Sequence, residues 1–373
     1  MNFYSYLLLI AMSIALISCD NNNDDPTGFS QELIDVLDAK IDSLMIHGSL
    51  PGLVINVSAS DGREYIRAKG VCNLETSAPR TVTDPFRIAS ITKTFTASVI
   101  HSLINEGRLS TSDKLSTHFP DFPNADIITV RNLLRMRSGI ADYADHAFLE
   151  LLYNDPLAVF TTQELLQISI DKADQFYTPD SITVYCNANF TLLGEIASQI
   201  EGKDIGTLIT ERVIEPLGLT NTIFPTNTNL SGNNHGYCWN DVNNEFDDFT
   251  VLNPLWAGAA GAVISTVEDL GIFVKALYNG ELMTSTVNTA KNEALSMDGA
   301  PPFIKYGEGI LNFGSFWGHN GTIFGFSSEM WYLPEEDAII IIDVNRLDED
   351  DLSQSMNAFL MASKTLFPEY VDW

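Results

Sequence analysis

Two serine–lysine pairs have the spacing of a nucleophile and its base, Ser-x-x-Lys, at Ser90–Lys93 and Ser169–Lys172. On a helix, residues three apart lie on one face, so the amine of the lysine can reach the hydroxyl of the serine. A serine hydroxyl is a weak nucleophile and needs such a base. Short patterns of this kind also occur by chance, and Ser90 alone could be a helix N-cap. The context favours Ser90–Lys93, which opens an apolar helical stretch, over Ser169–Lys172, which runs into a polar loop.

The stretch around Lys93 contains no partner for its charge, because no Asp or Glu occurs between Asp84 and Glu106. A nearby carboxylate would hold the lysine protonated and unable to act as a base. Keeping a lysine neutral at pH 7 means lowering its pKa by more than about 3 units, on the order of 4–5 kcal/mol. A neighbouring phenol that shares the missing proton would reduce this cost, and the two groups would then titrate as one system.

Two further patterns supply such a phenol and more polar groups: Tyr185-Cys186-Asn187, which precedes a helical stretch, and His319-Asn320-Gly321, which precedes a predicted strand. Each pattern alone is typical of a half-buried tyrosine, a capping asparagine or a turn glycine. In the order SxxK, YxN and HxG, the three patterns fit serine acyltransferases with a Ser/Lys/Tyr site.

Further stretches extend this pattern, namely ITVRNLLRMRSGIADY, EPLGLTNT, AGAAGAVISTVEDL and GHNGTIFGFSS. With them, nearly all of residues 31–373 resembles the penicillin-recognising serine hydrolases, the family of class C β-lactamases and serine D-Ala-D-Ala carboxypeptidases. His319 and SGIADY favour the carboxypeptidase branch, since class C β-lactamases usually have Lys at the position of His319.

The resemblance implies catalysis through a Ser90 acyl-enzyme. Tyr185, between Lys93 and His319, would relay protons to and from Ser90 and the leaving group. The backbone N–H groups of Ser90 and Thr322 would form an oxyanion hole, worth about 10²–10³ in rate per donor.

The resemblance also implies a set of substrate-binding residues: Asn187, His319, Asn320, Gly321 and Thr322. Asn187 would bind the substrate amide and the catalytic lysine, and the Thr322 hydroxyl could meet a substrate carboxylate. The sequence departs from many carboxypeptidases at Asn320, where they have Thr. Asn carries no charge and the nearest upstream cation is Lys305, so activity on esters or other amides stays open.

Three functions follow in order of preference. The first is a D-Ala-D-Ala carboxypeptidase-like hydrolase, and the second is a β-lactamase or esterase that uses the same site. The third, a non-catalytic lipoprotein that binds peptidoglycan or penicillin, is disfavoured by the intact Ser90, Lys93 and Tyr185. A Ser-His-Asp hydrolase is disfavoured because no G-x-S-x-G occurs. We expect no cofactor and no metal, since there is no HExxH and the cysteine spacings fit no zinc site.

The formal net charge of −29 argues against partners that are bound through negative charge, such as nucleic acid or anionic lipid. The acidic residues are scattered, which indicates a solvated surface. The resemblance implies a small-molecule or peptidoglycan-derived acyl substrate, and we expect a monomeric protein.

The N-terminus predicts export. An apolar run from Leu7 to Ile17 is short for a membrane span and ends in Leu16-Ile17-Ser18-Cys19, which resembles a lipoprotein box. Residues 1–18 would be the signal peptide, Cys19 the lipidated residue and 19–30 a flexible tether. This predicts attachment to a membrane of the cell envelope, facing the periplasm or the cell surface. An uncleaved anchor or a plain secretory signal remains an alternative. The other cysteines, Cys72, Cys186 and Cys238, allow at most one disulfide.

The remaining chain, 31–373, predicts one α+β unit of the β-lactamase/transpeptidase type. A hairpin around Asp61-Gly62, and strands in FSSEMWYLP and AIIIIDVN, place strands at both ends of the chain. Helical periodicity lies between them, at 92–105, 129–137, 162–170, 187–199 and 205–214, whereas 221–256 is loop-like. Later helices are expected after an N-cap at Ser265, with a stop at Gly280, and over 352–366. We predict an antiparallel sheet lobe over about 31–90 and 257–373, flanked by helices, with a helical lobe inserted over about 91–256.

Overall fold

The computed structural model describes residues 28–228, 230, 232–282, 293–347 and 354–373. The predicted signal peptide, Cys19 and most of the tether lie outside the described residues and stay predictions. None of the described helices combines the length and the hydropathy needed to cross a membrane. Cys72, Cys186 and Cys238 are buried, and none of them forms a disulfide within the described chain.

One antiparallel sheet of nine strands dominates the fold, in the order β3-β2-β1-β13-β12-β11-β10-β9-β8. Strand β1 pairs with β13, so the sheet joins the two ends of the chain, as predicted. The predicted turn at Asp61-Gly62 connects β1 and β2, with Gly62 at a positive φ of 93°. The fold class is confirmed. The strands are β1 (Gly52–Ala59), β2 (Glu64–Asn73), β3 (Ala78–Pro79), β8 (Leu295–Ser296), β9 (Ile304–Tyr306), β10 (Leu311–Phe313), β11 (Phe316–Ile323), β12 (Phe326–Leu333) and β13 (Ala338–Val344).

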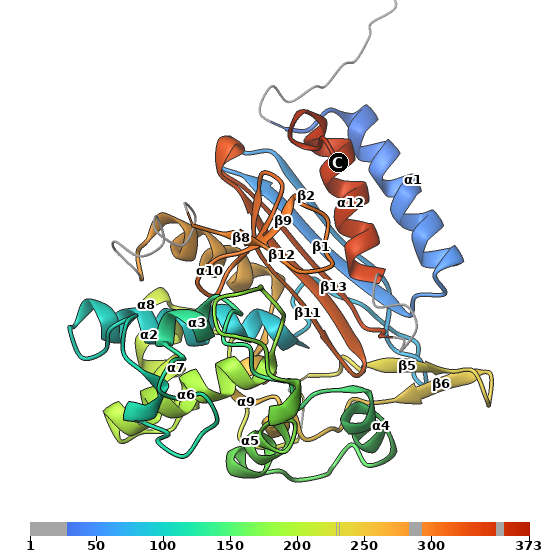
Figure 1. Cartoon of the computed structure of the whole chain (residues 1–373). Helices are drawn as coiled ribbons and strands as arrows, with labels where there is room; N and C mark the ends of the chain where they lie inside the picture. Colours follow the sequence, from blue (N-terminus) through green and yellow to red (C-terminus); the bar gives the residue numbers. More distant parts are fainter. Residues whose placement is uncertain (1–27, 229, 231, 283–292, 348–353) are drawn as a thin grey trace, which may run out of the picture.

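Helices cover both faces of the centre of this sheet, where β12 and β13 are buried along their whole length. Successive side chains of a strand point to opposite faces. Trp331 packs on Phe359 of α12 (Gln354–Leu366), and Tyr332 packs on Tyr278 of α10 (Val267–Asn279). Helix α1 (Gln31–His47) lies beside α12 (Figure 1).

The remaining helices form the part of the molecule below the sheet in Figure 1. They are α2 (Thr92–Asn105), α3 (Val130–Leu134), α4 (His146–Asn154), α5 (Thr162–Ile170), α6 (Asn187–Glu201), α7 (Ile205–Ile209), α8 (Glu215–Leu217) and α9 (Gly258–Gly261). A 3₁₀ turn, η1 (Ala89–Ile91), precedes α2. Two small antiparallel pairs complete the fold, β4 (Phe86–Arg87) with β7 (Ile264–Ser265), and β5 (Tyr237–Asn240) with β6 (Glu245–Asp248).

Some predicted boundaries need correction. The helices at 92–105 and 162–170 are confirmed, whereas the helix predicted at 129–137 is confined to α3. Ser265 is not the N-cap of α10, because it pairs with Phe86 in the ladder between β4 and β7. The neighbouring Thr266 caps this helix instead, accepting from the Asp269 N–H at 3.3 Å. The helix ends at Gly280, at a positive φ of 77°, as predicted.

Candidate active site

The site is centred on Ser90, in the turn η1 before α2. Ala89, the residue before it, has a φ of 48°, a left-handed conformation that is uncommon for a residue with a Cβ. The backbone of β11 lies directly against this turn. A Cβ on Gly321 would lie 2.2 Å from the carbonyl oxygen of Ile88 and 3.1 Å from the nitrogen of Ser90. Glycine at 321 is therefore required for the sheet to approach the nucleophile.

Lys93 is fully buried one turn after Ser90. Its Nζ lies 3.0 Å from the Ser90 Oγ, 2.7 Å from the Asn187 Oδ1 and 2.8 Å from the backbone oxygen of Ala260. Burial lowers the pKa of Lys93 to about 7, although the carboxylate of Asp142 opposes this shift. Desolvation thus supplies the lowered pKa that a neutral lysine requires.

The three partners of Lys93 accommodate an ammonium, which donates to all three, and equally a neutral amine, which is the form that can act as a base. The Asn187 Oδ1 and the Ala260 carbonyl oxygen can only accept hydrogen bonds, so they take the two N–H donors of an uncharged amine. The lone pair of the nitrogen then faces the Ser90 hydroxyl. Lys93 can therefore take the proton of Ser90 directly, as a general base must.

Tyr185 lies over this lysine, with the Lys93 Nζ 4.8 Å from the centre of its ring. Its hydroxyl is buried and makes no hydrogen bond of standard geometry with any described residue. Burial raises the pKa of the Tyr185 phenol, and the nearby Ser90 hydroxyl lowers it only in part. A protonated phenol with an unused donor beside the nucleophile can protonate a leaving group.

His319 stands on the other side of Tyr185, with 6.2 Å between the ring centres. Its Nδ1 lies 2.5 Å from the Asn320 carbonyl oxygen, which can only accept, so this nitrogen carries the hydrogen. The Nε2 then accepts from the Tyr306 hydroxyl at 3.3 Å. Burial lowers the pKa of His319 to about 3, so the ring is a neutral wall of the site.

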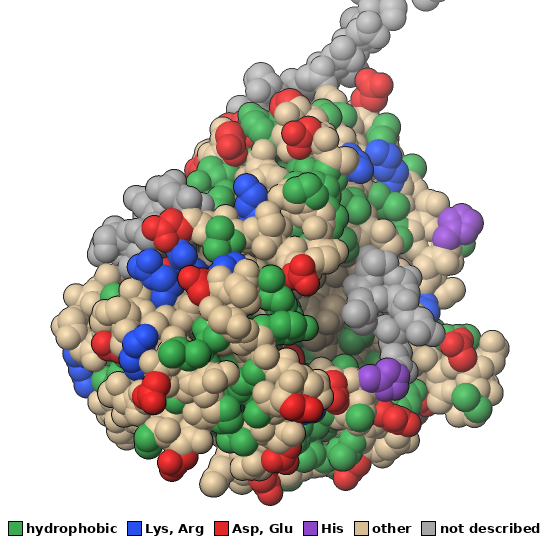
Figure 2. All heavy atoms as spheres, in the orientation of Figure 1, with side chains coloured by type: hydrophobic (Ala, Val, Ile, Leu, Met, Phe, Trp, Pro, Cys, Tyr) green, Lys and Arg blue, Asp and Glu red, His purple; other side chains and the backbone are tan. Residues whose placement is uncertain are grey.

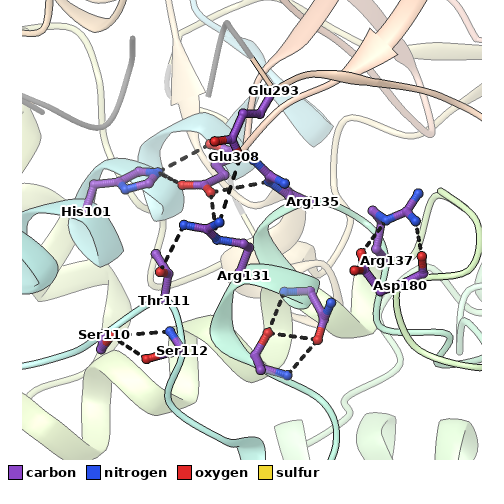
Figure 3. Close-up of polar contacts among 12 residues, drawn as sticks. His101, Ser110, Thr111, Ser112, Arg131, Arg135, Arg137, Asp180, Glu293 and Glu308 are labelled. Carbon is purple, nitrogen blue, oxygen red and sulfur yellow. Dashed lines mark hydrogen bonds and ion pairs between the residues drawn. The ribbon is translucent and has the colours of Figure 1, made fainter. Parts of the chain in front are cut away.

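Glu308, two residues after Tyr306, is held by two arginines and a histidine (Figure 3). The Glu308 Oε1 lies 3.3 Å from the Nε of Arg135 and 3.5 Å from the Nε of Arg131. The ring of His101, on α2, contacts Glu308 as well. The arginine ion pairs and the contact with His101 together fix the turn after β9 to α3 and α2. The sequence carried no local signal for Tyr306, because its partner is reached only across the sheet.

Asn187 begins α6, and its amide is used by two partners. Besides Lys93 at its Oδ1, it donates its Nδ2 to the Asp142 Oδ2 at 2.8 Å. Both the Oδ1 and the Nδ2 of Asn187, the side chain predicted to bind the substrate amide, therefore already have a partner within the protein. Asp142 lies in the stretch SGIADY but carries no local signal for this contact, because Asn187 is far along the chain.

The other predicted residues fall as follows. Asn320 and Thr322 are half-buried on β11, beyond the part of this strand that pairs with β10. Lys305 lines a separate surface pocket with Phe303, Asn312 and Glu369. In the second Ser-x-x-Lys, Lys172 donates to Asp145 at 2.7 Å and the Ser169 hydroxyl has no partner in the described chain, so this pair forms no site.

This geometry, a buried lysine and a tyrosine on one serine beside an antiparallel sheet, defines a serine hydrolase of the β-lactamase and penicillin-binding class. The family model described as Beta-lactamase matches residues 37–362, and the chain belongs to this family. Its members include amidases and aminopeptidases.

Several relatives are similar over most of the chain. The D-amino acid amidase of Ochrobactrum anthropi SV3 has a TM-score of 0.78 at 24% identity, over 90% of this chain and 97% of that one. A D-stereospecific amidohydrolase from a Streptomyces species has a TM-score of 0.77 at 26% identity, over 91% and 98%. Among curated sequences, Protein flp of Staphylococcus aureus is 27% identical over 86% of this chain, which spans 64% of that protein's length. The D-aminopeptidase of Brucella anthropi is 25% identical over 77% of this chain and 54% of its own length.

Proposed function

We propose that the protein is a serine amidohydrolase that opens amide or ester bonds through a Ser90 acyl-enzyme, and that it prefers leaving groups without a carboxylate. The observation that carries this proposal is the contact of the Ser90 hydroxyl with a buried lysine whose two other partners are obligate acceptors. The amidases and the aminopeptidase among its relatives support D-amino acid amides as the substrate class.

The charge of the binding groups supports the preference for uncharged leaving groups. His319 is neutral, and Asn320 and Thr322 carry no charge. The cations nearest to the motifs in sequence are engaged elsewhere. Arg87 donates to backbone carbonyl groups of Thr228 and Thr250, and Lys305 lines its separate pocket. A carboxypeptidase substrate would bring a terminal carboxylate to this neutral wall, and neither Arg87 nor Lys305 is placed there to meet it.

The test compares leaving groups on one purified protein. The panel comprises D-phenylalanine amide and its L-enantiomer, a 4-nitrophenyl ester, a peptide ending in D-Ala-D-Ala and a penicillin. We expect hydrolysis of the ester and of the D-amide in preference to the L-amide. The D-Ala-D-Ala peptide should be cleaved about 10–150-fold less efficiently than the D-amide, because a charge-assisted hydrogen bond to its carboxylate, worth about 1.5–3 kcal/mol, is missing.

The Ser90→Ala protein is the control for contaminating activity. Efficient release of D-Ala from the peptide, with slower release of ammonia from the D-amide, would overturn this proposal in favour of the carboxypeptidase. Rapid turnover of the penicillin would favour the β-lactamase.

The predicted location in the cell envelope is part of the same proposal. Figure 2 shows acidic side chains scattered over the face in view, as on a solvated surface. We expect that Cys19→Ser releases the protein from the membrane fraction of its native host, since it removes the thiol that would carry the lipid. A wild-type protein that is soluble and begins at a residue other than Cys19 would contradict the lipoprotein prediction.

A further inference from the structure

Asp142 is a carboxylate next to the catalytic lysine that does not touch it. It lies in the loop after α3 and accepts three hydrogen bonds from the start of α6. Its Oδ1 accepts from the backbone N–H groups of Asn187, at 3.0 Å, and Ala188, at 3.4 Å. Its Oδ2 accepts from the side-chain Nδ2 of Asn187 at 2.8 Å.

This third bond decides which way the amide of Asn187 points. An asparagine amide carries a donor and an acceptor of nearly the same shape, so its orientation follows from its partners. A carboxylate accepts only, and therefore takes the Nδ2 and leaves the Oδ1 for Lys93. In the opposite orientation the Nδ2 would donate to the amine of Lys93 and occupy the lone pair that must face Ser90.

The loop that carries Asp142 is held independently of any substrate. Lys172 donates from its Nζ to the backbone oxygen of Asp142 at 2.9 Å and to the Oδ2 of Asp145 at 2.7 Å. The hydroxyl of Tyr143 donates to the backbone oxygen of Trp256 at 3.2 Å. The carboxylate is thus in position before catalysis begins.

We propose that Asp142 is a positioning residue for acylation: it fixes the amide of Asn187 in the one orientation that leaves the lone pair of Lys93 directed at Ser90. The inference rests on the proposed Ser90 acyl-enzyme and assigns Asp142 a role through Asn187, without contact to the substrate.

Two substitutions at Asp142 separate positioning from packing. In Asp142→Asn, the amide oxygen is expected to take the place of Oδ1, where it accepts from two backbone N–H groups. The amide nitrogen then takes the place of Oδ2, which has a single donor as its partner. The new NH₂ then faces the Nδ2 of Asn187 and turns this amide the wrong way. Asp142→Ala removes more contacts, but it leaves Asn187 free to adopt either orientation. If Asp142 positions Asn187, the acylation rate should therefore be lower in Asp142→Asn than in Asp142→Ala. If its role is purely structural, the rate should be lower in Asp142→Ala.

The measurement is single-turnover acylation by a 4-nitrophenyl ester, with a fluorophosphonate as a second probe of Ser90. We expect Asp142→Asn to acylate at least about tenfold more slowly than Asp142→Ala, and both more slowly than wild type. The matched control is Asp145→Asn, which loses an ion pair in the same loop and should stay within about threefold of wild type. The proposal would be overturned if Asp142→Ala acylated as slowly as Asp142→Asn. It would also be overturned if Asp142→Asn acylated within about threefold of the wild-type rate.

If Asp142→Asn folds poorly, the pH dependence of acylation in Asp142→Ala still tests the proposal. The titratable groups that face Lys93 are Tyr185, Cys186, His319 and Asp142 itself. Because the carboxylate of Asp142 raises the pKa of Lys93, its removal in Asp142→Ala should shift the acid limb of acylation to lower pH. An unmoved limb would refute the coupling. A wild-type protein that neither probe acylates would instead refute the proposed function.

Discussion

Ser90→Ala is expected to abolish labelling by fluorophosphonates and β-lactams and to lower ester hydrolysis by roughly 10⁴–10⁶, the range seen when a nucleophile that acts as one unit with its base is removed. The substitution removes only the oxygen that contacts the Lys93 Nζ. Binding groups along β11 stay in place, so the loss should appear in the rate of acylation. Intact-mass spectrometry after incubation with each probe measures it.

The matched control is Ser169→Ala in the second Ser-x-x-Lys. Ser169 is fully buried in α5, and Lys172 is bound to Asp142 and Asp145. Replacing Ser169 by alanine should therefore leave the labelling of the protein unchanged. A labelled peptide that contains any serine other than Ser90 would rule out the mechanism.

The second large effect is expected at Lys93, where methionine keeps an unbranched apolar side chain of nearly the same length and removes the base. Lys93→Met should lose roughly 10⁴–10⁶ in acylation rate, as the nucleophile variant does. In wild type, a pKa of about 7 for Lys93 means that the neutral, active form is lost as pH falls. The acylation rate by an uncharged ester should therefore decrease below about pH 7, approaching tenfold per pH unit. His319, with a pKa of about 3, does not titrate in this range.

Stopped-flow acylation against pH measures this limb. In Lys93→Met, any residual rate should lack the limb near pH 7. A wild-type rate that stays constant between pH 8 and 5 would show that Lys93 is not the base.

Tyr185→Phe tests how the proton travels onward from this base. We expect acylation to slow by about 10²–10⁴, the usual share of a positioned acid or base, with little change in thermal stability because the ring is kept. A combination with Lys93→Met should be far from additive, since both groups serve one proton transfer. A rate within about threefold of wild type would refute the relay, because RT ln 3 is only about 0.65 kcal/mol against the 2.7–5.4 kcal/mol that such a loss implies.

The parts of the fold that follow local rules were predictable from the sequence. Helices α2 and α5 have clear periodicity, and Gly62 marks its hairpin turn. Where two residues satisfy the same local rule, tertiary structure decides. Both Ser265 and Thr266 can cap a helix, and the pairing of Ser265 with Phe86 leaves the cap to Thr266. The hairpin of β5 and β6 was missed because its acidic, Asn-rich sequence resembles a loop.

At the site, the nucleophile and its base were predictable because only two residues separate them in the chain, across the junction of η1 and α2. Asp142 and Tyr306 were not, because each acts on a residue far along the chain, Asn187 and His319. The pKa of the lysine was also out of reach, since it depends on burial by α6 and α9. The sequence around Lys93 contains no carboxylate, but Asp142 comes close from a loop that is distant in the chain and raises the pKa of the lysine.

The left-handed backbone at Ala89 has a consequence for how the protein can change under selection. A residue with a Cβ in this conformation costs of order 1–3 kcal/mol and persists only where its surroundings hold it, as η1 and β11 hold Ala89 immediately before the nucleophile. Thermostability would then favour a relaxed backbone at Ala89, whereas reactivity requires the left-handed conformation that presents the Ser90 hydroxyl. Lineages that lose the need for hydrolysis are free to relax it, and a non-catalytic descendant could keep Ser90 and Lys93 in its sequence while this backbone no longer presents the hydroxyl.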